Sequence, residues 1–132
     1  HHRNHGNFCR YHFNPFVMNL DRNSKLLRIF LGELDKHKGI PLYESLVFAA
    51  RKNGVAGATV FRGILSYGAS SRIHTAKLLD LSMDLPIIVE IVDTQAKIDE
   101  FIEITNPMNE EAGCVALITI EAAEVIRYKA KK

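Results

Sequence analysis

The 132-residue chain has few cysteines, no long apolar run and almost no surplus of charge of either sign. Cys9 and Cys114 could form at most one bridge, so the disulfide framework of a small secreted protein is excluded and a reducing cytoplasm is expected. Apolar runs such as 87–89 and 114–118 are far too short to cross a bilayer, so we expect a soluble protein without membrane insertion. The formal net charge of +2 does not favour a nucleic acid as partner.

Sequence motifs of common catalytic sites are also absent. The sequence contains no Walker loop and no HExxH motif, and neither His37 nor His74 lies beside an obvious nucleophile. A weak hydrolase that uses Asp93 or Glu90 stays open as an alternative, although a lone carboxylate seldom suffices for hydrolysis. The sequence therefore predicts a binding protein and not an enzyme.

Residues 1–24 differ in character from the rest of the chain and show neither a helical nor a strand period. Four of the six histidines lie there: His1, His2, His5 and His12. His5, Cys9 and His12 are possible zinc ligands by type, but their spacing matches no closed four-ligand pattern, so no metal site is expected. We expect the natural chain to begin at or near Met18, with 1–24 an extension and 25–132 a single domain.

Four strands are expected from the apolar patterns. They cover 26–31, 58–67, 87–92 and 114–120. Gly63 inside the second strand indicates a bulge or a close approach of another backbone. The stretch 75–85 is predicted to be either a short helix or an extra edge strand, and 33–39 is predicted to be a solvated polar loop.

Two helices are expected between these strands. Pro41 opens the first at its first helical position, and Asn53-Gly54 closes it. Asp93-Thr94 caps the second, which Asn106-Pro107 is expected to end before a polar turn over 108–113.

The element order strand, helix, strand, strand, helix, strand predicts an α+β fold of the ferredoxin-like split βαβ type (βαββαβ). Both helices then cover one face of a four-stranded antiparallel sheet. The opposite face would carry large apolar residues whichever way the strands are turned, because Leu26, Phe30, Ile88 and Val92 alternate with Leu27, Ile29, Ile87, Val89 and Ile91. Self-association through the sheet is therefore expected. Glu90 is a charge within an apolar strand, and Arg28 or Arg62 is its expected partner.

A small-residue and basic segment, 68–74, follows the second strand. Gly68 can adopt backbone angles that other residues resist. Ser70, Ser71, Arg72 and His74 offer hydroxyl, guanidinium and imidazole donors suited to an anion. The segment predicts either a site for a phosphate-bearing ligand or a solvated connection between two strands.

Three stretches carry a family resemblance: LLRIFLGELDKHKGIPLYE (26–44), GATVFRGILSYGASSRIH (57–74) and LSMDLPIIVEIVD (81–93). Together they resemble the PII-like family known as domain of unknown function 190, which is related to the PII nitrogen-regulatory signalling proteins. The resemblance implies a homotrimer that binds a small effector between subunits and acts on a protein partner, with a membrane transporter or channel as one candidate. A ligand-free scaffolding trimer is the alternative.

The resemblance also implies where the effector binds. Residues 68–74 correspond to the base of the PII effector loop, and 106–113 to a glycine-rich nucleotide-contacting turn. Only Gly113 remains in that turn, and Glu110 and Glu111 are acidic, so a smaller adenine nucleotide is favoured among AMP, ADP and ATP. The expected ligand-binding residues are Arg62, Tyr67, Gly68, Ser70, Ser71, Arg72, His74 and Gly113.

Overall fold

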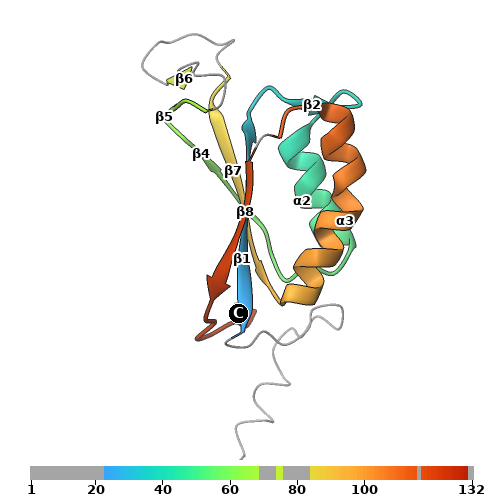
Figure 1. Ribbon diagram of the computed structural model, residues 1–132, viewed down its shortest axis with the longest axis vertical. Coiled ribbons are helices and arrows are strands. Elements are labelled where there is room, and N and C mark those ends of the chain that lie inside the picture. The colour runs from blue at the N-terminus through green and yellow to red at the C-terminus, as the bar shows by residue number, and fades with distance from the viewer. Residues whose placement is uncertain (1–22, 69–73, 76–83, 116, 131–132) are drawn as a thin grey trace, which may run out of the picture.

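Four antiparallel strands form a central sheet, and two helices cover one of its faces (Figure 1). The computed structural model describes residues 23–68, 74–75, 84–115 and 117–130. The strand order is β4 (Thr59–Arg62), β7 (Pro86–Asp93), β1 (Ser24–Gly32) and β8 (Leu117–Ala123). The helices are α2 (Leu42–Lys52) and α3 (Gln95–Ala112). The predicted α+β, ferredoxin-like fold is confirmed. Within the described part of the chain, no helix is long and apolar enough to cross a membrane.

The core lies between the sheet and the helices. Side chains alternate between the two faces of a strand, so every second residue of β1 and β7 points at the helices. The buried members are Leu27, Ile29, Leu31, Ile87, Val89 and Ile91. They pack with Leu42, Leu46 and Ala50 of α2 and with Ile98 and Phe101 of α3. Each fully buried large side chain contributes about 1.5–3 kcal/mol to folding, which explains why these two strands occupy the middle of the sheet.

Helix α2 begins one residue later than predicted. Pro41 is its N-cap and not its first helical residue. At the other end of α2 the chain turns at Gly54, whose φ of 76° is a value that glycine adopts readily. The predicted end of this helix at Asn53-Gly54 is confirmed. The polar segment before the helix is not an unstructured loop. It contains a hairpin of β2 (Lys36–His37) and β3 (Ile40–Pro41) with a turn at Lys38 and Gly39, both at positive φ.

Helix α3 continues through the proline that was expected to end it. The Thr94 cap is confirmed, because its hydroxyl accepts a hydrogen bond from the Lys97 N–H at 3.2 Å. The predicted stop at Asn106-Pro107 and the turn over 108–113 are wrong, since the helix reaches Ala112. Beyond Pro107 the buried stripe continues with Met108, Asn109 and Ala112. Burial of this stripe outweighs the cost of one missing amide bond.

The predicted second strand is interrupted at Gly63. Strand β4 stops at Arg62, and β5 (Leu65–Ser66) pairs with β6 (His74–Thr75) as a separate ladder. The Gly63 N–H donates to the Pro86 carbonyl at 2.7 Å, and a Cβ at Gly63 would lie 2.7 Å from the Pro86 Cγ. The close backbone approach that Gly63 indicated is confirmed.

Two other predictions concern the strand limits. The last strand was expected over 114–120, but β8 lies three residues later because Cys114 and Val115 still belong to the connection from α3. The choice between helix and strand over 75–85 falls mostly outside the described residues, which include only Thr75 in β6 and Asp84 and Leu85 before β7.

No described element packs on the other face of the sheet, which we call the open face. One row across it consists of four apolar side chains, one from each strand: Phe61, Ile88, Phe30 and Leu117. The next row is polar: Thr59, Glu90, Arg28 and Thr119. The predicted uncovered apolar face is therefore present, and Phe61 leaves 47% of its surface exposed.

Candidate ligand-binding cleft

A cleft of about 540 Å³ lies on the open face, at the end of the sheet where β7 finishes. Three separate parts of the chain line it: residues 56–59 before and at the start of β4, Glu90 and Val92 of β7, and residues 123–128 after β8. The volume falls in the range of pockets that hold small organic ligands. The cleft is therefore a candidate ligand site among the described residues.

The cleft combines apolar walls with a few polar groups. Ala58, Val92 and Ile126 contribute apolar surface, whereas Thr59 and Glu90 form a polar pair on the floor, opposite each other in the register. Such a mixture is typical of sites that enclose an aromatic or aliphatic group and orient it by a few hydrogen bonds.

Glu90 has the partner that the sequence suggested first. The Arg28 Nε lies 3.0 Å from Glu90 Oε2, and its Nη1 lies 2.5 Å from Glu121 Oε1. The hydrogen bond to Glu90 and the two carboxylates raise the pKa of Arg28, so it stays cationic. Since Arg28 reaches Glu90 through one nitrogen, the other carboxylate oxygen of Glu90 is available as an acceptor towards the cleft.

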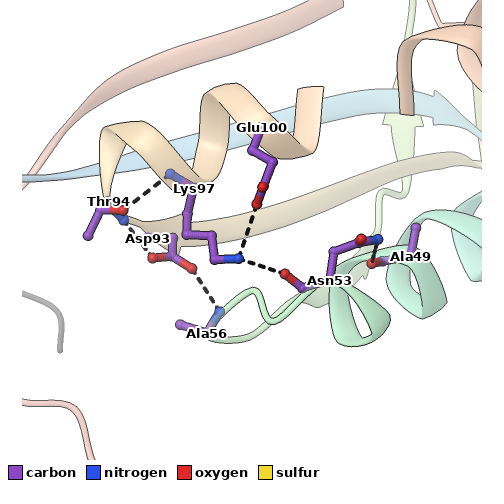
Figure 2. A network of polar contacts seen from close by, with 7 residues as sticks. All are labelled: Ala49, Asn53, Ala56, Asp93, Thr94, Lys97 and Glu100. Carbon is purple, nitrogen blue, oxygen red and sulfur yellow. Dashed lines mark hydrogen bonds and ion pairs between the residues drawn. The ribbon is translucent and has the colours of Figure 1, made fainter. Parts of the chain in front are cut away.

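Asp93 holds the wall of the cleft at Ala56 (Figure 2). This carboxylate is 1% exposed; one oxygen accepts from the Ala56 N–H at 2.8 Å and the other from the Thr94 N–H at 2.7 Å. Backbone donors of this kind are the usual partners of a buried carboxylate. Asp93, which the hydrolase alternative invoked, thus serves as a structural acceptor that ties Ala56 to the start of α3.

Lys97 secures the same wall from the helix side (Figure 2). Its ammonium group donates to the Asn53 carbonyl at 2.7 Å and to Glu100 Oε1 at 3.1 Å. The Asn53 amide in turn donates to the Ala49 carbonyl at 2.8 Å, which closes the end of α2. The connection from α2 to β4 is therefore fixed by side chains of α3 as well as by its own helix.

The C-terminal segment completes the cleft. The Tyr128 hydroxyl donates to the Ala56 carbonyl at 2.5 Å, although the two residues are 72 positions apart. Partial burial and the nearby Asp93 charge raise the pKa of Tyr128, so the phenol remains a donor throughout the neutral range. Arg127, which also lines the cleft, is exposed and adds a cationic group at its rim.

The predicted binding residues lie elsewhere or outside the described chain. Arg62 pairs in register with Ile87, about 10 Å along the strands from the Thr59–Glu90 pair. Its guanidinium binds Glu33, at 2.5 Å between Nη2 and Oε2, and not Glu90. Tyr67 and Gly68 are exposed beyond β5. Ser70, Ser71 and Arg72 lie outside the described residues, and His74 is placed in β6 by its backbone.

Gly113 sits at the end of α3, where its φ of 66° lets it serve as the C-cap. Nearby, His37 of β2 contacts Glu111, and the half-buried Cys114 thiol donates to the Ala112 carbonyl at 3.0 Å. Burial, followed by the charge of Asp35, raises the pKa of Cys114, which makes it a poor nucleophile. Among the described residues no group of His, Cys, Asp and Glu is placed to hold a metal, and His5, Cys9 and His12 lie outside them.

Sequence reasoning therefore missed most of the cleft. Thr59 belongs to a segment quoted for the family resemblance, and Glu90 was recognised as an unusual charge, but it was assigned mainly a structural role. The sequence around these two residues therefore contained information about the cleft. The sequence around Arg127 and Tyr128 contained none, because only the folded chain shows that the C-terminal segment returns to Ala56.

The comparisons with known proteins agree with the fold. The profile of the DUF190 family, described as Uncharacterized ACR, matches residues 24–125. A UPF0166 protein of Aquifex aeolicus is 42% identical over 102 residues, which cover 77% of this chain and 92% of that protein. A UPF0166 protein of Methanocaldococcus jannaschii is 36% identical over 76 residues, covering 58% of this chain and 69% of the relative.

Two solved structures of CPII, a nitrogen regulatory PII-like protein from Thiomonas intermedia K12, share the fold. One is bound to ADP and bicarbonate, with a TM-score of 0.58 and 19% identity. The other is bound to ADP, AMP and bicarbonate, with a TM-score of 0.60 and 18% identity. Each comparison covers 79% of this chain and 89% of the CPII chain. The PII-like resemblance predicted from the three sequence stretches is confirmed.

Proposed function

The chain belongs to the DUF190 family, and from this premise we propose that it is a PII-like regulatory protein that binds an adenine nucleotide in the cleft. The observation that carries the proposal is the cleft itself, which has apolar walls, a Thr59–Glu90 pair on its floor and Arg127 at its rim. Support comes from CPII, a protein of the same fold whose structures hold ADP and AMP.

The floor of the cleft offers hydrogen-bonding groups to an adenine base. Adenine presents an exocyclic amino group as donor. The Glu90 carboxylate can accept a hydrogen bond from this amino group. The Thr59 hydroxyl can donate to a ring nitrogen beside it, and Val92 and Ile126 offer apolar contact to the faces of the base.

The charges around the cleft suit a short phosphate chain. Arg127 can bind a phosphate through two parallel hydrogen bonds, but Glu90 and Glu124 also line the cleft and disfavour a large negative charge. AMP or ADP is therefore the proposed effector, ahead of ATP. Arg72 and the rest of 68–74 are retained as a proposed alternative phosphate site, separate from the cleft.

The apolar row of the open face supports the homotrimer. Phe61, Ile88, Phe30 and Leu117 form a continuous strip, and a monomer would leave this strip in water. In the proposed trimer the three open faces pack together through it. Because the cleft lies on the same face, a neighbouring subunit would border it. A ligand bound in the cleft would then contact or shift the interface between subunits.

The proposed output is a protein partner in the cytoplasm. The ladder of β5 and β6 lies at the end of the sheet opposite the cleft, and exposed apolar side chains lie in and beside β5: Ile64, Leu65 and Tyr67. Exposed apolar side chains are suited to protein contact. A membrane transporter or channel is one partner class that the resemblance to PII proteins suggests.

Isothermal titration with AMP, ADP and ATP tests the proposal. We expect AMP and ADP to bind and ATP to bind more weakly at the same concentrations. The same apolar row would also serve a ligand-free scaffolding trimer, the alternative from another class. Absence of heat with every adenine nucleotide at millimolar concentration would leave the scaffold as the better account.

A further inference from the structure

The C-terminal segment 123–128 spans the end of the open face from one edge to the other. It leaves β8 at one edge strand, and the Tyr128 side chain reaches Ala56, which lies just before β4 at the opposite edge. Crossing three strand spacings takes about 14 Å, and five extended residues cover about 17 Å. The segment is therefore long enough to reach across, it bends at Ile126, and all of its residues line the cleft, so it forms one wall of the cleft.

The wall is held at its far end by Tyr128. Ala56 is bound on both sides of its backbone: Asp93 accepts from its N–H, and Tyr128 donates to its carbonyl. The middle of the segment is loosely covered, with Ile126 76% exposed. A single neutral hydrogen bond at a partly exposed position is weak enough to break frequently. The volume of about 540 Å³ is measured with the segment 123–128 in place. The segment therefore lines the cleft and does not fill the space that a ligand would occupy.

We propose that Tyr128 is a positioning residue for the ligand. Its hydrogen bond to the Ala56 carbonyl, which we call the latch, holds residues 123–128 in place as a movable wall of the cleft. The nucleotide leaves when this hydrogen bond breaks. The inference rests on the proposed function, because it assigns a role within the same cleft. Tyr128 itself holds the wall through Ala56. The contacts to the ligand come from Thr59, Glu90 and the inner side of the segment.

Stopped-flow kinetics with a fluorescent N-methylanthraniloyl derivative of ADP tests the latch in the full chain. Tyr128→Phe removes the hydroxyl and keeps the ring. We expect roughly threefold to tenfold faster dissociation of the nucleotide, because loss of the hydrogen bond lets the wall open more often. A chain that ends at Arg127 should dissociate at least as fast. Tyr43→Phe, which removes a hydroxyl from α2 on the covered face, is the matched control and should behave as wild type.

Limited trypsinolysis measures the wall without any ligand. Cleavage after Arg127, followed by mass spectrometry of the truncated chain that ends at Arg127, should be faster in Tyr128→Phe and unchanged in Tyr43→Phe. Equal cleavage in wild type and Tyr128→Phe would overturn the latch. Faster cleavage with unchanged nucleotide dissociation, or tighter binding in Tyr128→Phe, would overturn its role as a wall for the ligand. If wild type binds no adenine nucleotide, the proposed function fails. The trypsin cleavage rates alone then decide whether Tyr128 holds the segment 123–128 in place.

Discussion

The two ends of the open face are built in different ways. At the cleft end, hydrogen bonds made by Asp93 of β7, by Lys97 of α3 and by Tyr128 converge on the connection between Asn53 and Ala56. At the loop end, β5 and β6 form a ladder of only two residue pairs, and Tyr67 is 71% exposed. Dense long-range bonding holds a site in shape, whereas sparse local bonding leaves a segment able to adapt. The first arrangement suits a ligand, and the second suits a protein partner.

The largest effect is expected in the row that lies between the two ends. Phe61→Asp places a charge in the proposed trimer contact. Loss of apolar burial together with burial of a carboxylate in three copies should weaken assembly by at least roughly a thousandfold. Sedimentation should then show a species of the 14.9 kDa chain mass in place of one three times heavier. Phe48→Asp on α2 is the matched control, because Phe48 is 62% exposed on the opposite layer. A wild-type protein that is monomeric at micromolar concentration would refute the trimer.

The second test concerns the rigidity of the cleft end. Asp93→Ala leaves the N–H groups of Ala56 and Thr94 without their acceptor, and we expect the free energy of unfolding to fall by about 3 kcal/mol. Urea denaturation followed by circular dichroism measures this change. Asp99→Ala on the exposed side of α3 should cost less than about 0.5 kcal/mol. Similar losses in the two variants would show that Asp93 does not anchor the wall.

The third test separates the cleft from the loop base as ligand site. Glu90→Ala removes the proposed acceptor for the adenine amino group and should raise the AMP dissociation constant about tenfold to a hundredfold. Glu121→Ala is its control, because Glu121 shares the Arg28 partner. Titration calorimetry gives both constants. Unchanged affinity in Glu90→Ala, with a large loss in Arg72→Ala, would move the site to the loop base.

The smallest effect is expected at the loop end. Arg62→Ala breaks an ion pair with Glu33 whose arginine side chain is 57% exposed, so the free energy of unfolding should change little. AMP affinity should stay within about twofold of wild type. Thermal unfolding and calorimetry on the same preparations check both values. A tenfold loss of AMP affinity would mean that the two ends form one continuous site.

The sequence predicted the fold better than the site for a physical reason. The alternation of inward-facing and outward-facing side chains over 26–31 and 87–92 indicates which residues can be buried together, and burial of apolar side chains dominates the choice of fold. The stop at Pro107 failed because a local steric rule was outweighed by burial of Met108 and Ala112 in tertiary contacts. The cleft depends on the meeting of Ala56 and Tyr128, and no pattern within either segment reports on the other.

A crystal structure of the protein soaked with AMP tests the central claim most directly. The account predicts electron density for the adenine ring against Val92, with its amino group within hydrogen-bond distance of Glu90 and the segment 123–128 closed over it. Adenine density beside Gly68, or an empty cleft at millimolar AMP, would contradict it.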